Sequence, residues 1–208
     1  MSSNSLEKIL SKLKVDVVFI PQKDEIYSKN FSTSLVEEIL SPKIEGASRP
    51  NFFGGVLTVV SLLFNIVKPN RAYFGEKDLQ QLMVVKKMVA DLKYPIQIIS
   101  VKTVREQSGL AISSRNQYLN QQEKEEAKII YTCLVEAKEK ILCNTQIKTI
   151  KHEMIAVLQS KKMKVDYISF VKLDSFEELN DSVVYPLAIC IAVWYKKVRL
   201  IDNIIITK

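Results

Sequence analysis

The chain has 208 residues, of which 47% are hydrophobic and 25% are charged, and its formal net charge is +7. This composition excludes a disordered chain, because enough apolar side chains are present to form a core. The length allows one sizeable domain or two small ones.

The first fifty residues begin with a helix and a strand. Leu6 to Leu13 have apolar residues at helical spacing after Ser5, a possible N-cap, so a short helix is predicted there. The mostly apolar run 15–20 is typical of a buried strand in a parallel sheet. The remaining segments are predicted to be irregular at 22–34, apart from a short edge strand near 31–33, helical at 34–40 and a loop at 44–50.

Residues 55–101 alternate between helix and strand patterns. An apolar helix is predicted over 55–67 and a short buried strand over 72–74. An amphipathic helix follows over 77–92, and Pro95 precedes a strand at 96–101. Such alternation predicts an α/β fold with a parallel sheet.

The second half of the chain places two helices before a series of strands. A domain boundary is predicted near residues 102–104, and Asn120 is predicted to cap a long helix that runs to about Cys143. The later elements are a helix over 145–160 and strands at 165–171, 183–195 and 198–206, with a turn at Lys196-Lys197. This order predicts an α+β domain with an antiparallel sheet, so the two domains are expected to span 1–103 and 104–208.

Two short segments in the middle of the chain have the chemistry of a phosphate site. Gly75 ends the strand at 72–74, and Lys77 and Asp78 open the next helix. The free N–H groups of a helix start favour an anion, and a lysine there is otherwise repelled by the positive helix end. Ser113-Ser114-Arg115 adds two hydroxyls and a guanidinium, groups that bind phosphate oxygens.

The distribution of charge and cysteines excludes several other classes. The basic excess is spread over both halves of the chain, so pairs such as Lys196-Lys197 are interpreted as solvated surface, with RNA binding as the alternative. The three cysteines are far apart and predict neither a disulfide framework nor a zinc site. No run approaches the length of a membrane span, and the first residues lack a signal-peptide pattern. We expect a cytoplasmic protein with no membrane or nucleic-acid partner.

Four segments in the same order resemble the pantothenate synthetase (pantoate–β-alanine ligase) family. They are residues 55–65, the run from Phe74 to Gln81, the run from Gly109 to Leu119 and the last strand around Val198 to Asn203. The resemblance implies an ATP-dependent ligase that joins pantoate and β-alanine through a pantoyl-adenylate intermediate and releases AMP and pyrophosphate. It also implies Mg²⁺ with the ATP and a homodimer. The first domain would be part of an incomplete, Rossmann-like doubly wound sheet, and the second a small α+β lid.

The resemblance assigns ATP binding chiefly to five residues. Lys77 matches a lysine that contacts the phosphates, and Asp78 matches a ribose partner, although it also suits a helix start without any ligand. Ser113, Ser114 and Arg115 match phosphate ligands that close over the site, with a capped turn as the alternative. Lys77, Ser113 and Arg115 are therefore the expected catalytic residues.

Four further residues are assigned less directly by the same resemblance. Gly75 would allow the backbone to approach the nucleotide, or would simply make the turn. Val104 matches a position whose backbone meets adenine, but a strand valine is also an ordinary core residue. Gln81 and Arg49 would bind pantoate, with an exposed helix residue and a surface loop residue as the alternatives.

The sequence departs from the family pattern in its histidines. The family has a His-x-Gly-His motif near its start, whose histidines serve ATP and the adenylation transition state, whereas the single histidine here is His152. Phe52 stands where the family has a histidine after Arg-Pro-x. We therefore expect the chain to correspond to the C-terminal two-thirds of such a ligase. The alternative function is a non-catalytic remnant that binds nucleotide or a complementary N-terminal fragment.

Overall fold

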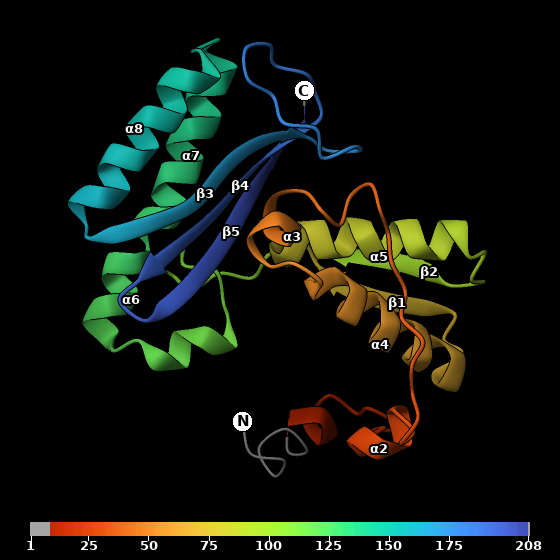
Figure 1. The fold of residues 1–208 in the computed structure, drawn as a ribbon. Helices are drawn as coiled ribbons and strands as arrows, with labels where there is room; N and C mark the ends of the chain where they lie inside the picture. The colour runs from red at the N-terminus through yellow and green to blue at the C-terminus, as the bar shows by residue number, and fades with distance from the viewer. Residues whose placement is uncertain (1–8, 208) are drawn as a thin grey trace. The chain divides into compact units, whose positions relative to one another are not determined.

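The structure, a computed structural model, describes residues 9–207. The chain divides into two units, residues 1–33 and residues 34–208. The second unit contains both sheets and every residue expected in the site (Figure 1). Within the described part of the chain, no helix is long and apolar enough to span a bilayer.

Short helical segments and irregular chain make up residues 9–33, the described part of the first unit. Residues 9–12 are helical, which agrees with the described part of the helix predicted over 6–13, whereas Ser5 and Leu6 lie outside the described residues. The helix α2 (Lys23–Ile26) interrupts the stretch that was expected to be irregular. The edge strand predicted near 31–33 is not formed.

The buried strand predicted at 15–20 is wrong. These residues have no strand assignment, and Val17 and Ile20 are 79% and 60% exposed. A strand is defined by hydrogen bonds to a neighbour, and no segment of residues 9–207 pairs with this one. Its apolar sequence is therefore not matched by a partner within the described residues.

A two-stranded parallel sheet opens the second unit. The strands β1 (Arg71–Gly75) and β2 (Gln97–Val101) pair in parallel, with Tyr73 opposite Ile99. The connection between them is the 3₁₀ turn η1 (Glu76–Asp78), which leads into the helix α5 (Leu79–Asp91). This is the helical crossover that a parallel pair requires. It places η1 at the carboxyl end of β1.

The helix α4 (Phe52–Val67) packs against α5. Its buried Phe53 and Leu57 belong to one apolar cluster with Leu82 and Val85 of α5. The helix begins three residues before its predicted start at residue 55, after Asn51 in the left-handed region with φ of 63°. The apolar pattern of residues 55–67 is thus confirmed as a helix.

Between residues 34 and 50 the structure has irregular chain where a helix was predicted and a helix where a loop was predicted. Residues 34–40 are not helical, because the Glu37 carboxylate accepts the N–H groups of Ile39, Leu40 and Ser41 at 2.7–3.1 Å and turns the chain before Pro42. The segment predicted as a loop contains instead the short helix α3 (Ile44–Ser48).

Three antiparallel strands and three helices form the rest of the second unit. The strands are β3 (Met163–Lys172), β4 (Leu187–Tyr195) and β5 (Val198–Ile206), in the order β3-β4-β5. Asn120 caps the helix α6 (Gln121–Ala127), as predicted, with a reciprocal contact from Glu123. The single long helix predicted there is divided at Lys128 into α6 and α7 (Ile129–Leu142), and α8 (Ile147–Ser160) follows.

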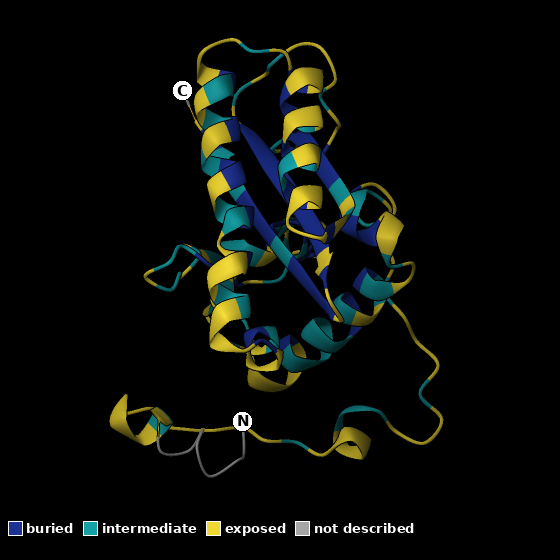
Figure 2. Ribbon diagram, turned by 90° about the vertical axis from the view of Figure 1, so that its left-hand side faces the viewer, coloured by how far each residue is buried: buried dark blue, intermediate teal, exposed yellow. Residues whose placement is uncertain are grey.

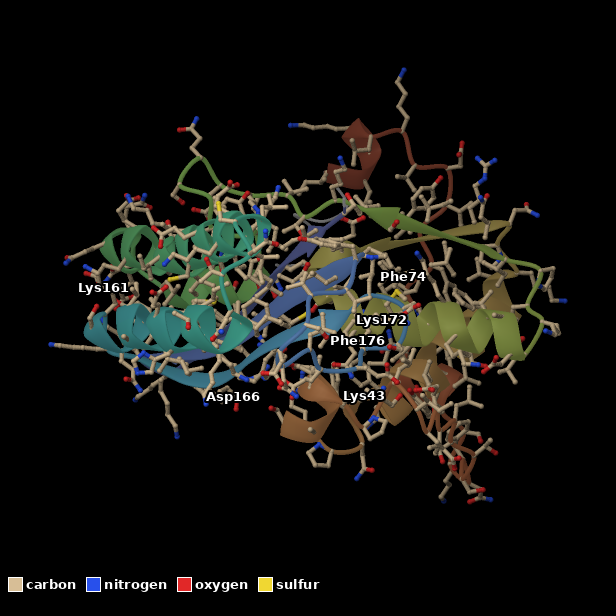
Figure 3. The ribbon with its side chains drawn as sticks, turned by 90° about the horizontal axis from the view of Figure 1, so that it is seen from above. Lys43, Phe74, Lys161, Asp166, Lys172 and Phe176 are labelled. Carbon is tan, nitrogen blue, oxygen red and sulfur yellow. The ribbon has the colours of Figure 1, made fainter. Side chains whose placement is uncertain are left out.

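The antiparallel sheet is covered on both faces. Figure 2 shows its buried strands behind α7 and α8, whose outer faces are exposed. On the opposite face, Ala188 and Cys190 of β4 belong to the apolar cluster that includes Phe53 of α4 and Leu79 of α5. Lys43 reinforces this junction, since its Nζ donates to the carbonyl of Ser175 at 2.7 Å, next to buried Phe176 (Figure 3). The two sheets, one parallel and one antiparallel, confirm the predicted fold class.

Candidate active site

A cavity of about 280 Å³ lies where η1, the loop at 113–115 and β5 meet. Seven of the residues predicted from the sequence line the cavity, and they come from three separate segments of the second unit: Arg49, Lys77, Asp78, Gln81, Ser113, Ser114 and Arg115. Gly75 and Val104 are not among the lining residues. The fold therefore brings together most, but not all, of the site residues that were predicted from the sequence.

Lys77 lies two residues beyond the end of β1, in the 3₁₀ turn η1 that leads into α5. Its side chain is 18% exposed, and its Nζ lies 3.9 Å from Asp78 Oδ2. A cation at this end of a helix is unfavourable by itself, and a single distant carboxylate compensates it weakly. The position is at the carboxyl end of a parallel strand, where open α/β sheets bind ligands. An anion bound in the cavity would compensate the positive charge of Lys77.

Gly75 has no conformational reason to be glycine. Its φ is −73° and its ψ is 134°, which any residue adopts, and a Cβ built on it meets no atom within 4 Å. The alternative interpretation, that this glycine is needed to make the turn, is therefore wrong. Gly75 is not among the residues that line the cavity, so the close approach of its backbone to the nucleotide stays a prediction.

Replacing Gly75 with alanine should stabilise the protein while weakening nucleotide binding. The native backbone accommodates alanine, so the lower entropy of the unfolded chain should add about 0.4–1 kcal/mol to the free energy of unfolding. The new methyl group would occupy space that the nucleotide needs. Urea denaturation and ATP titration measure the two effects. An alanine variant that binds ATP as the parent does would contradict the assignment of Gly75 to the nucleotide.

The loop that carries Ser113 and Arg115 is shaped by a tight turn at Gly109. Gly109 has φ of +94°, and a Cβ there would lie 2.7 Å from the Tyr131 ring, so only glycine fits. Ser113 Oγ accepts the N–H of Arg115 at 3.2 Å, and Arg115 Nη1 donates to the carbonyl of Arg199 at 2.9 Å. The Ser113 hydroxyl keeps its proton for donation, and Arg115 retains further N–H groups for an anion.

Val104 stands apart from the cavity. It is 63% exposed, so the alternative that it is a core residue is wrong. Its carbonyl accepts the N–H of Ile112 at 2.9 Å and closes the base of the loop around Gly109. The structure thus gives Val104 a role in the loop, while its contact with adenine stays a prediction.

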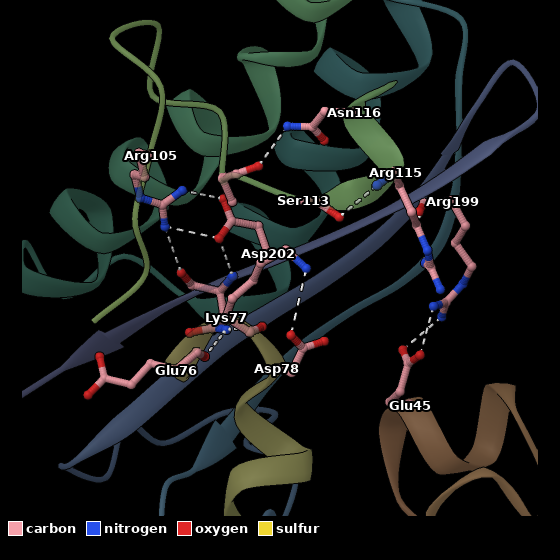
Figure 4. A network of polar contacts seen from close by, with 12 residues as sticks. Glu45, Glu76, Lys77, Asp78, Arg105, Ser113, Arg115, Asn116, Arg199 and Asp202 are labelled. Carbon is pink, nitrogen blue, oxygen red and sulfur yellow. Dashed lines mark hydrogen bonds and ion pairs between the residues drawn. The ribbon is translucent and has the colours of Figure 1, made fainter. Parts of the chain in front are cut away.

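A buried ion-pair network that the sequence did not reveal ties α3 to the antiparallel sheet (Figure 4). Arg199 of β5 is 8% exposed and donates to both Glu45 oxygens at 2.8 Å and to Asp166 Oδ2 at 2.7 and 2.9 Å. Tyr167 donates its hydroxyl to Glu45 Oε2 at 3.0 Å. These contacts hold α3, and with it the neighbouring Arg49, at the cavity.

The stability of the protein should fall in acid because of Glu45. Burial alone would raise the pKa of Glu45, but the hydrogen bonds and charge of Arg199 outweigh it and hold the pKa below its ordinary value of 4.5. A group whose pKa is lower in the folded state stabilises the fold above its unfolded pKa. We therefore expect its contribution to be lost as the pH falls below 4.5 and through the folded-state pKa.

Urea denaturation at a series of pH values measures this effect. The Glu45→Gln variant should show a shallower loss of stability between pH about 5 and about 3 than the parent. Glu136→Gln, the same change at an exposed position of α7, is the control. An equal slope for Glu45→Gln and the parent would contradict the assignment.

Gln80 and Gln81 are adjacent in sequence and have different roles. Gln80 is 6% exposed; its Oε1 accepts the N–H of Glu45 at 2.9 Å, and its Nε2 donates to the carbonyls of Leu40 and Lys43 at 2.7 Å. It therefore fixes the start of α3. Gln81 is partly exposed and lines the cavity.

Asp202 and Asn203 of β5 also line the cavity and were not nominated by the sequence. Asp202 accepts two hydrogen bonds from Arg105, at 2.6 and 2.9 Å, and Arg105 lies over the Tyr131 ring. Arg199, Asp202 and Asn203 interrupt an otherwise apolar strand. Buried polar residues in an apolar run are the signal that could have identified them.

The cavity lacks the histidines that the family pattern would place there, as far as the described residues show. Phe52 lines it, with the Arg49 guanidinium 3.6 Å from the ring centroid. His152 is exposed on α8, which packs on the other face of the antiparallel sheet, and it does not line the cavity. The described residues therefore bring no imidazole to the site.

Comparison with known proteins decides the family. A sequence model described as pantoate-beta-alanine ligase matches residues 4–205. The chain belongs to this family. The pantothenate synthetase of Thermosipho africanus is 46% identical over 205 residues, which cover 97% of this chain and 73% of that protein. The one from Fervidobacterium nodosum is 42% identical over 96% of this chain and 71% of its own length.

Solved structures of pantoate-beta-alanine ligases are also similar to this chain. The pantothenate synthetase of Thermus thermophilus superposes with a TM-score of 0.93 at 36% identity, over 100% of this chain and 76% of that one. The ligase of Francisella tularensis, described as complexed with beta-gamma ATP and beta-alanine, has a TM-score of 0.78 at 33% identity, over 99% of this chain and 70% of its own.

Proposed function

We propose that this chain catalyses the ATP-dependent ligation of pantoate and β-alanine through a pantoyl-adenylate intermediate. The observation that carries the proposal is the convergence of Lys77 with Ser113, Ser114 and Arg115 on one cavity. These groups come from segments that are well separated in sequence and together suit a polyphosphate. Family membership and the ATP-bound relative support the choice of reaction.

The proposed chemistry has two transfers. A pantoate carboxylate oxygen attacks the α-phosphorus of ATP, the bond to the β-phosphate oxygen breaks, and pyrophosphate leaves. The β-alanine amine then attacks the acyl carbon, the bond to AMP breaks, and the amine gives up its proton. Both steps build negative charge on phosphate oxygens, which preorganised cations stabilise. Lys77 and Arg115 would supply the positive charge. The hydroxyls of Ser113 and Ser114 would donate hydrogen bonds to the same phosphate oxygens.

The remaining predicted residues would hold the rest of the substrates. Asp78, whose side chain is 48% exposed, would accept hydrogen bonds from the ribose, and Gly75 would lie beside it. Gln81 and Arg49 would hold pantoate, and the guanidinium of Arg49 would bind the carboxylate of pantoate. Val104 would contact adenine through its backbone.

Magnesium would enter with the ATP. The described residues contain no group of three or more His, Cys, Asp or Glu side chains placed to hold a metal ion. Of the carboxylates that line the cavity near Lys77, Asp78 is half exposed and Asp202 is engaged by Arg105. These residues do not form a protein-held Mg²⁺ site, so the phosphates and water would supply most ligands of the ion.

The proposal extends to organisation and location. Residues 1–103 would form the nucleotide- and pantoate-binding domain and residues 104–208 a lid, in a cytoplasmic homodimer of the kind the family resemblance implies. The three cysteines are free, which suits a reducing compartment.

A second candidate function is nucleotide binding without ligation. The observation that favours it is the lack of any imidazole at the cavity within the described residues, together with Phe52 in its lining. Losing charge-stabilising donors commonly costs about a hundredfold or more in rate. Such a protein would bind ATP through Lys77 and Arg115 but would not activate pantoate.

Pantoate-dependent exchange of pyrophosphate into ATP tests the proposal directly. Exchange by the purified chain, together with pantothenate formation after β-alanine is added, would support the ligase. Binding of ATP without exchange would favour the second candidate. A folded chain that neither binds ATP nor catalyses exchange would overturn both.

A further inference from the structure

Asn203 makes an unusual pair of contacts with the first turn after β1. It lies on β5, is 5% exposed, and its Nδ2 donates to the carbonyls of Glu76 and Lys77 at 2.8 and 2.9 Å. The side-chain amide therefore donates both of its protons to two consecutive carbonyls, which lie 127 and 126 residues away in sequence. The site proposed above gives Asn203 no role.

These contacts fix the direction of two peptide planes. In a trans peptide the C=O and the following N–H point in opposite directions. Because Asn203 holds the carbonyls of Glu76 and Lys77, the N–H groups of Lys77 and Asp78 point away from Asn203. Without this donor, the carbonyls could rotate, and their negative ends would compete with a bound phosphate.

We propose that Asn203 is a positioning residue for the nucleotide phosphates, which it serves by holding the turn that carries Lys77; this inference rests on the proposed function. The same strand holds the second cation of the site, because Arg115 donates to the carbonyl of Arg199 at 2.9 Å. Thus β5 fixes Lys77 and Arg115 relative to one another. The adjacent Asp202 binds Arg105 and secures the base of the loop that leads to Arg115.

The test compares ATP with adenosine, which lacks the phosphates. Asn203→Leu keeps the volume of the side chain, adds no charge and removes both donors. We expect its dissociation constant for ATP to rise by about tenfold or more, because the turn that carries Lys77 loses two hydrogen bonds. Adenosine affinity should stay within about twofold. Asn180→Leu, the same change in a loop residue outside the cavity lining, is the control and should affect neither ligand.

Each other outcome contradicts the proposal in a distinct way. Equal losses of ATP and adenosine binding by Asn203→Leu would show a structural role, and unchanged ATP binding would show no role at all. If Asn203→Leu does not fold, Asn203→Ala is measured instead, and two unfolded variants would overturn the positioning role. A parent protein that fails to bind ATP would overturn the proposed function itself and this inference with it.

Discussion

The Arg199→Met variant should lose about 3–5 kcal/mol of its free energy of unfolding. Arg199 is buried and compensates two carboxylates, Glu45 with a 7% exposed side chain and Asp166 with 27%. Removing the guanidinium would leave Glu45 charged, desolvated and without its strongest partner. Methionine fills a similar volume, so the loss measures the uncompensated charge more than a cavity.

Urea denaturation of the variant and the parent measures this loss. Arg71→Met, the same substitution at an exposed position of β1, is the control and should change stability by less than about 0.5 kcal/mol. The double variant Glu45→Gln, Arg199→Met should regain part of the loss, since it removes the orphaned charge as well. A cost below about 1 kcal/mol for Arg199→Met would contradict the buried network.

The Lys77→Ala variant should slow pantoate-dependent exchange by about a hundredfold or more. The lysine lines the cavity and has a carboxylate only at 3.9 Å, so its charge is available to a phosphate. The free energy of unfolding without ligand should stay the same or rise by up to about 0.5 kcal/mol, because a cation leaves the positive end of a helix. Lower activity with unreduced stability is the expected combination.

The two measurements separate a site residue from a structural one. Lys86→Ala, on the helix α5 that follows the Lys77 turn but outside the cavity lining, is the control and should keep the exchange rate of the parent. A Lys77→Ala protein that loses stability and activity together would indicate a structural lysine. Full exchange activity in that variant would contradict the assignment of Lys77 to the phosphates.

Local sequence patterns determined most of the elements and one part of the site. The apolar periodicity of residues 55–67 and 77–92 and the apolar runs of β1, β2 and β5 need only short-range information. Asn120 was recognised as a cap because the capping contact with Glu123 is local. The segments Lys77-Asp78 and Ser113-Ser114-Arg115 were found because their residue types match phosphate chemistry.

Two of the failed predictions depend on interactions that are not periodic. The helix expected at 34–40 is replaced by a turn in which one side chain, Glu37, takes three backbone N–H groups. The strand expected at 15–20 depends on a partner, and the pattern of one segment contains no information about whether a partner lies beside it.

The sequence by itself determined the two sheets, the family and the segments that carry the phosphate-binding residues. Only the tertiary structure decided how those segments meet. Arg199, Asp202 and Asn203 are isolated polar residues in an apolar strand, and their partners Glu45, Arg105 and Lys77 lie 97 to 154 residues away. Burial makes such long-range polar contacts strong and costly to leave unmade, so they fix the geometry of the cavity.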